Sequence, residues 1–251
     1  MIENGIYEGD CIDYCNWVAN NYGEVFDLIV TSPPYNVDLG NNKYKTEGYN
    51  SYDDNKDHDE YLDWLEAVFA EVGRAVKSGG RICINIGDGK NGRVPTHVHV
   101  SQMMEDLGYL PFTTLIWNKK QIGNRTAWGS WKSASCPSFP TPFEYILVFA
   151  KESLKLQTEG ESDIEKQEFI DWSLAMWEFG CESNPDHPAQ FPIELPKRLI
   201  KMLSYTNARV YDPFAGAGTT LVAAKQLGRD YAGSEIDPEY CDTCLERLSN
   251  V

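Results

Sequence analysis

The stretch that decides the fold is Arg209-Val210-Tyr211-Asp212-Pro213-Phe214-Ala215-Gly216-Ala217-Gly218-Thr219-Thr220. Residues 209–211 read as a short strand, two glycines mark a turn, and a helical pattern follows over 220–227. Glycines at such a turn let the backbone pass close to a ligand. The first turn of the helix also presents N–H groups without intrahelical partners, which favour an anion. The stretch therefore predicts an α/β fold that holds a ligand where this strand meets its helix.

The rest of the 251-residue chain repeats this alternation of strands and helices. Apolar runs predict strands at 26–31, 81–86, 113–117, 145–149, 209–211 and 231–234. Helical patterns cover 60–77, 98–107, 195–203, 220–227 and 238–248, and Ser78-Gly79-Gly80 is expected to end the first of them. The acidic stretch 151–171 is expected to be a surface insertion near the edge of the sheet. The alternation predicts a single domain, residues 1–251, with a mostly parallel sheet and helices on both faces.

An acidic residue stands where nucleotide-binding folds hold a ribose. Glu235 lies 23 residues beyond Asp212, directly after a predicted strand, and its carboxylate can accept hydrogen bonds from both ribose hydroxyls. A dinucleotide and S-adenosylmethionine both carry a ribose to such a place. The dinucleotide fingerprint requires a third glycine where this chain has Leu221, so S-adenosylmethionine is favoured. Its carboxylate is a small anion that the turn and the hydroxyls of Thr219 and Thr220 could hold.

A rigid corner follows the predicted strand 26–31. Its residues are Ser32, Pro33, Pro34 and Tyr35. Consecutive prolines fix φ and donate no hydrogen bond, so the neighbouring carbonyls and side chains are held in one arrangement. The Ser32 hydroxyl and the Pro33 carbonyl can accept the two hydrogens of a planar exocyclic amine, while Tyr35 can stack on the ring of a flipped nucleotide. The corner is therefore a candidate catalytic site for chemistry on a base.

Charge is unevenly distributed along the chain. The net charge is −16, yet residues 107–143 contain no Asp or Glu and carry +4, which leaves −20 on the remainder. This distribution would steer a polyanion to one face, and aromatic residues among cations suit stacking on bases. The residues expected to contact nucleic acid are Lys119, Lys120, Arg125, Trp128, Trp131 and Lys132. A loop that merely lacks acids would have the same composition, so composition alone leaves both interpretations open.

With both motifs in view, the chain resembles the amino-methylating DNA methyltransferases. Their catalytic motif is [D/N/S]-P-P-[Y/F] and their cofactor loop is D-P-F-x-G-x-G-T, and residues 32–35 and 212–219 match without departure. The motif order resembles that of the circularly permuted β group. The resemblance covers nearly the whole chain. It implies the Rossmann-like fold of S-adenosylmethionine-dependent methyltransferases, with that molecule as cofactor.

The resemblance also implies roles for residues outside the two motifs. Gly9-Asp10 resembles a motif upstream of the catalytic strand, which implies that Asp10, with Cys11 beside it, contacts the adenine. His187 and Pro188 belong to a segment that resembles the one closing over the methionine part. The implied cofactor residues of the loop and the next strand end are Asp212, Pro213, Phe214, Ala215, Gly216, Gly218, Thr219, Thr220, Glu235 and Ile236. Residues 117–143 correspond to the target-recognition insert, so the expected partner is double-stranded DNA.

The expected activity is site-specific methylation of N4 of cytosine in DNA, because Ser at the first motif position leans towards cytosine in this family. Methylation of N6 of adenine is the close alternative. A nicotinamide-dependent oxidoreductase is more distant, since no acid or base for hydride transfer is evident. A catalytically inactive DNA-binding module is the third alternative. A cognate restriction endonuclease is an implied partner, and a monomer or a homodimer is expected.

Several other features are interpreted as structural. Cys241 and Cys244 lie three apart in a helical pattern, which suits two small buried side chains better than zinc ligands, and no metal is expected. His97 and His99 precede a helix without an acidic partner nearby and are expected to face solvent or cap it. Scattered cysteines, the lack of a long apolar run and the lack of a signal peptide predict a cytoplasmic protein without a membrane partner.

Overall fold

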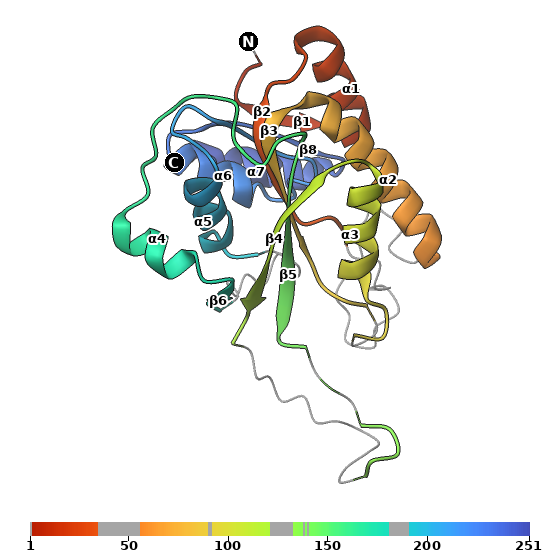
Figure 1. The fold of residues 1–251 in the computed structure, drawn as a ribbon. Helices are drawn as coiled ribbons and strands as arrows, with labels where there is room; N and C mark the ends of the chain where they lie inside the picture. Colours follow the sequence, from red (N-terminus) through yellow and green to blue (C-terminus); the bar gives the residue numbers. More distant parts are fainter. Residues whose placement is uncertain are drawn as a thin grey trace.

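The computed structural model describes residues 2–34, 56–89, 92–120, 133–137, 139, 141–180 and 191–251. Within these residues, eight strands form one sheet in the order β1-β8-β7-β2-β3-β5-β4-β6 (Figure 1). The strands are β1 (Gly5–Glu8), β2 (Phe26–Thr31), β3 (Val76–Ile86), β4 (Leu110–Asn118), β5 (Phe143–Ala150), β6 (Met176–Glu178), β7 (Arg209–Asp212) and β8 (Asp230–Glu235). β5 runs antiparallel to its neighbours β3 and β4, and the other described pairs are parallel. The predicted mostly parallel α/β sheet is confirmed.

Helices cover both faces of this sheet, as predicted. They are α1 (Cys11–Tyr22), α2 (His58–Ala75), α3 (Thr96–Asp106), α4 (Lys166–Trp172), α5 (Glu194–Leu203), α6 (Thr219–Gln226) and α7 (Pro238–Ser249). One hydrophobic core joins α1, α2 and α3 to one face, and a second joins α5, α6 and α7 to the other (Figure 1). No helix in the described ranges has both the length and the apolar character needed to cross a membrane.

The parallel strands deliver their last residues to one edge of the sheet. β2 and β7 are neighbours, with Leu28 opposite Val210, so their last residues, Thr31 and Asp212, meet at this carboxyl edge. β8 lies beside β7 and ends at Glu235. Loops after parallel strands form ligand sites at this edge in open α/β sheets. The two predicted motifs are therefore brought to the same side of the molecule, although 181 residues separate Thr31 from Asp212.

The structure corrects some expected element boundaries and adds elements. α2 ends at Ala75 rather than at 77, because Val76 adopts an extended conformation, pairs with Phe26 and begins β3. Ser78-Gly79-Gly80 lies within that strand and does not end the helix. The short strands β1 and β6 and the helices α1 and α4 were not predicted.

The acidic stretch 151–171 lies at the surface, as expected, and is fixed there by ion pairs. α4 has no buried residue. Asp163 accepts hydrogen bonds from both terminal nitrogens of the buried Arg229, each at 2.7 Å. Lys201 of α5 forms an ion pair with Glu168 of α4. The stretch is therefore attached to the body of the domain at separate points.

Candidate functional site

The candidate catalytic corner follows a strand that is buried along its whole length. All six residues of β2 are buried, so the strand is a rigid support for what comes next. Ser32 and Pro34 are half-buried and Pro33 is buried. Tyr35, the remaining member of the predicted motif, lies outside the described residues. The corner therefore presents Ser32 at the carboxyl edge, directly after Thr31.

A buried carboxylate joins this corner to the glycine turn. The Thr31 hydroxyl donates to Asp212 Oδ1 at 2.6 Å, and the backbone N–H of Phe214 donates to the same oxygen at 3.0 Å. Asp212 is only 1% exposed. Burial raises the pKa of Asp212 to about 6, although hydrogen bonds from Thr31 and Thr220 act in the opposite direction. The sequence predicted Asp212 at the site, but not that its carboxylate would be enclosed by the chain's own donors.

The glycine turn keeps its shape through positive φ angles and close packing. Gly216 and Gly218 have φ values of 49° and 77°, which side chains rarely adopt. A Cβ on Gly218 would lie 2.2 Å from the Sγ of Cys244, so α7 packs directly against the turn. Arg247 of the same helix donates to the Ala217 carbonyl at 2.7 Å. Contacts with α7 thus hold the glycine turn in place at the carboxyl edge of the sheet.

The hydroxyls after the turn are engaged within the protein. Thr219 Oγ1 accepts a hydrogen bond from Arg247 at 3.1 Å. The Thr220 hydroxyl donates to the Val30 carbonyl at 3.3 Å, and Thr220 is fully buried beside Asp212, whose pKa it lowers. Both side chains therefore brace the turn, which leaves the backbone N–H groups at the start of α6 as the donors that suit a small anion.

Glu235 is oriented by backbone donors. Gly216 donates to its Oε2 at 2.8 Å and Asp237 to its Oε1 at 3.0 Å. Burial raises the pKa of the Glu235 carboxyl, and hydrogen bonds from the backbone of Asp237, Gly216 and Ile236 partly offset that effect. The backbone N–H of Ile236 is a third donor to this carboxylate, which has about four acceptor sites, so capacity remains for a ribose hydroxyl. Ile236 follows at 50% exposure and offers apolar surface beside the acid.

Asp10 and Cys11 lie next to Glu235, because the backbone N–H of Gly9 donates to the Glu235 carbonyl at 2.7 Å. Asp10 is exposed and is the N-cap of α1, where its Oδ1 accepts from the backbone of Ile12 at 2.7 Å. Cys11 is buried, and burial raises the pKa of its thiol. Asp10 and Cys11, expected to contact the adenine, thus lie beside Glu235, which is expected to bind the ribose.

Two cations of the predicted nucleic-acid stretch have acidic partners from outside it. Lys119 forms an ion pair with the buried Glu144, which also accepts a hydrogen bond from the Asn85 amide at 2.7 Å. Lys120 lies 3.3 Å from Glu178, and both side chains are largely exposed. The sequence analysis did not predict these pairs because Glu144 and Glu178 lie outside the acid-free residues 107–143.

The other predicted site residues lie outside the described residues. They are Arg125, Trp128, Trp131, Lys132, His187 and Pro188. In the sequence the first four fall between β4 and β5, which pair with each other up to Asn118 and Phe143.

The expectation for His97 and His99 was wrong. His97 Nδ1 lies 2.7 Å from the Asp88 carboxylate, and its ring stacks on Tyr145 with centroids 3.7 Å apart. His99 Nδ1 lies 2.7 Å from the Nε2 of His58, which begins α2. Both rings are part-buried and tie α3 to neighbouring elements, so neither is a solvent-facing side chain.

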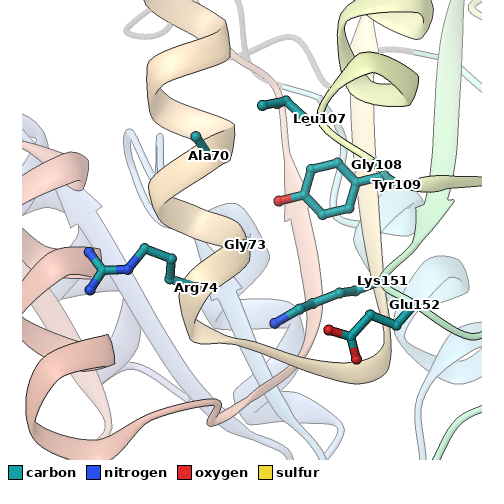
Figure 2. A pocket seen from close by; sticks show the side chains of 8 residues that line it. All are labelled: Ala70, Gly73, Arg74, Leu107, Gly108, Tyr109, Lys151 and Glu152. Carbon is teal, nitrogen blue, oxygen red and sulfur yellow. The ribbon is translucent and has the colours of Figure 1, made fainter.

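A cavity of about 340 Å³ lies away from these residues. It is lined by Ala70, Gly73, Arg74, Leu107, Gly108, Tyr109, Lys151 and Glu152. Tyr109 and Lys151 point towards α2 across it (Figure 2). Because β3 begins directly after α2, this cavity is near the amino end of that strand and holds none of the predicted site residues.

Comparison with known proteins gives consistent matches. Residues 26–246 match the model of the N6/N4 DNA methylase family. The type II methyltransferase M.MjaVI of Methanocaldococcus jannaschii is 43% identical over 165 residues, which cover 65% of this chain and 81% of that protein. The type II methyltransferase M.BglII of Bacillus subtilis is 29% identical and covers 98% of this chain and 69% of its own length.

Solved structures share the fold. The Thermus thermophilus protein TTHA0409, solved in complex with S-adenosyl-L-methionine, superposes with a TM-score of 0.75 at 28% identity, covering 98% of this chain and 93% of that one. The cytosine-N4-specific PvuII DNA methyltransferase superposes with a TM-score of 0.69 at 21% identity, covering 99% of this chain and 87% of that one.

Proposed function

The chain belongs to the N6/N4 DNA methylase family, and from this premise we propose that it transfers the methyl group of S-adenosylmethionine to N4 of cytosine at a specific site in double-stranded DNA. The observation that carries the proposal is the 2.6 Å hydrogen bond from Thr31 to Asp212. It joins the residue before the Ser-Pro-Pro corner to the first residue of the glycine turn. A methyl donor seated at the turn would therefore lie beside a base held at the corner.

The residues at the carboxyl edge fit S-adenosylmethionine. When bound, this cofactor supplies an electrophilic methyl group on a sulfonium centre. Glu235 keeps acceptor capacity for the ribose hydroxyls, and the exposed Ile236 beside it suits the adenine ring. The N–H groups at the start of α6 suit the carboxylate. Asp10 and Cys11 border the adenine end, and His187 with Pro188 would close over the methionine end.

The Ser-Pro-Pro corner is suited to polarise an exocyclic amine. The Ser32 hydroxyl and the Pro33 carbonyl would accept the two amine hydrogens of a base flipped out of the duplex, with Tyr35 stacked on its ring. Accepting these hydrogens draws electron density onto the nitrogen, whose lone pair is otherwise delocalised into the ring. The amine nitrogen would then bond to the methyl carbon in line as the sulfur–methyl bond breaks, S-adenosylhomocysteine would leave, and the methylated amine would lose one proton to solvent. The chain's contribution is positioning and electrostatic stabilisation, and no covalent enzyme intermediate is needed.

Ser as the first residue of the corner favours cytosine, while the family as a whole includes N6 and N4 enzymes. Residues 117–143 would read the target sequence, with Lys119, Lys120, Arg125, Trp128, Trp131 and Lys132 as the contacts to DNA. The type II designation of M.MjaVI and M.BglII supports a restriction-modification setting, in which a cognate endonuclease would share the target.

The variant Ser32→Ala tests the catalytic assignment. We expect its affinity for S-adenosylmethionine to stay within about threefold of wild type, while turnover on DNA falls by at least about 100-fold, because a positioned hydrogen-bond acceptor is lost. Ser204→Ala is the matched control. Ser204 is buried, its hydroxyl donates to the Ile200 carbonyl at 2.6 Å at the end of α5, and it lies outside the proposed site. Turnover in Ser32→Ala equal to that of Ser204→Ala would contradict the assignment.

A further inference from the structure

Thr31 has an unusual position in the fold. It is the last residue of β2, it is 1% exposed, and it directly precedes Ser32. Its hydroxyl donates to Asp212 Oδ1 at 2.6 Å. A hydroxyl at the end of a fully buried apolar strand is costly unless it is hydrogen-bonded, so this single contact accounts for a polar side chain at this point.

The strand and the turn are linked a second time, in the opposite direction. Thr220, in the first turn of α6, brings its hydroxyl within 3.3 Å of the Val30 carbonyl. Thr31 therefore reaches from the catalytic strand to the turn, and Thr220 reaches from the turn's helix back to the strand. Asp212 accepts hydrogen bonds from Thr31 and from the backbone of Phe214, and it is buried with Thr220 beside it.

We propose that Thr31 is a positioning residue for methyl transfer, whose hydroxyl fixes Ser32 relative to the glycine turn through Asp212. The inference rests on the proposed function and names a determinant of its rate. A displacement of about 1 Å between reacting groups can cost about 100-fold in rate. Loss of one link between strand and turn would permit a displacement of this kind without removing any residue that touches the base or the methyl donor.

The link also predicts a signature in the pH profile. Burial is the main cause that raises the pKa of Asp212, and the negative charge of Glu235 on β8 acts in the same direction. Cys244 on α7 also interacts electrostatically with Asp212, and burial raises the pKa of its thiol to about 12, so it stays neutral. The Thr31 hydroxyl opposes the rise. Its removal should therefore shift the pKa of Asp212 further upward.

The test compares Thr31→Val, which keeps the side-chain shape and removes the hydroxyl, with Thr31→Ser, which keeps the hydroxyl, and with the control Ser204→Ala. We expect Thr31→Val to lower the single-turnover methylation rate by about 10- to 100-fold and to leave the Kd for S-adenosylmethionine within about threefold. The acid limb of its pH–rate profile should move up by about one unit, the equivalent of one lost hydrogen bond. Thr31→Ser should restore most of the rate.

Three outcomes would overturn the proposal: an unchanged rate in Thr31→Val, an acid limb that does not move, or a rate no better in Thr31→Ser. Should Thr31→Val fail to fold, Thr220→Val removes the second link and should slow transfer in the same way. If the wild-type chain itself methylated no base, the proposed function would fail first. The pH dependence of the unfolding free energy of Thr31→Val would then still report whether the Thr31–Asp212 bond holds the carboxylate.

Discussion

Replacing Gly218 by alanine should destabilise the glycine turn for two separable reasons. Gly218 has a φ of 77°, and a residue with a Cβ pays about 1–2 kcal/mol for that conformation. The added Cβ would also lie 2.2 Å from Cys244 Sγ and 3.0 Å from Cys244 Cβ, and overpacking of this kind costs about 1–3 kcal/mol. The free energy of unfolding should therefore fall by about 2–5 kcal/mol.

The matched control is Gly228→Ala. Gly228 has a similar φ of 67°, but a Cβ there would meet no atom within 4 Å. It should show the conformational cost alone. For a chain of this size, each kcal/mol lowers Tm by about 2–4 °C, so we expect a loss of about 4–20 °C for Gly218→Ala and about 2–8 °C for Gly228→Ala.

A double-mutant cycle isolates the contact with α7. Cys244→Ala removes the sulfur that the new Cβ would strike, so Gly218→Ala should cost about 1 kcal/mol less in that background. Thermal unfolding followed by circular dichroism gives the Tm values, and calorimetric titration gives the Kd for S-adenosylmethionine. We expect this Kd to rise for Gly218→Ala and not for Gly228→Ala. Equal costs for the two glycine variants, or no coupling to Cys244, would refute the packing argument.

Two further predictions concern charge. Lys119→Ala leaves the buried Glu144 without its cation and should lower the free energy of unfolding by about 2–4 kcal/mol. Lys120→Ala breaks an exposed ion pair and should change the free energy of unfolding by less than about 1 kcal/mol. Urea unfolding measures both. Equal losses would contradict the assignment. Because the pKa of Asp212 is raised from 3.8 to about 6, the folded state binds the additional proton between these values, and the resulting stability is present below pH 4 and lost as pH rises through 6. Between pH 4 and pH 7, the free energy of unfolding should therefore fall by about 2–3 kcal/mol less in Asp212→Asn than in wild type. If plots of unfolding free energy against pH were parallel for the two proteins, Asp212 would not be the group responsible.

The sequence was most informative where local pattern and burial agree. Residues 26–31 form a strand-favouring run apart from Asp27, and β2 has these same bounds. α2 was predicted too long because Val76 also fits the apolar spacing of the helix, and only its pairing with Phe26 across the sheet decides that it is extended. β1 and β6 are only four and three residues long, and β1 has no buried residue. Neither strand therefore leaves a sequence pattern that differs from that of a loop.

Motifs at the candidate site were predictable, whereas their partners were not. Asp212 and Glu235 follow from spacing, but the Thr31 hydroxyl that donates to Asp212 is 181 residues away, and its contact depends on β2 and β7 being neighbours. The pairing of His58 with His99 depends on the packing of α2 against α3. Glu144 could have been found, since a hairpin through the basic window would bring its second strand beside Lys119.

Methyl transfer to DNA tests the central claim most directly. The wild-type chain would be incubated with S-adenosylmethionine carrying a radiolabelled methyl group and with mixed-sequence double-stranded DNA, which is then digested to nucleosides and separated by chromatography. We predict label in N4-methylcytosine. Label in N6-methyladenine would keep the catalytic account and change the base. Absence of label from every nucleoside, while S-adenosylmethionine still binds, would contradict the claim that this chain methylates DNA.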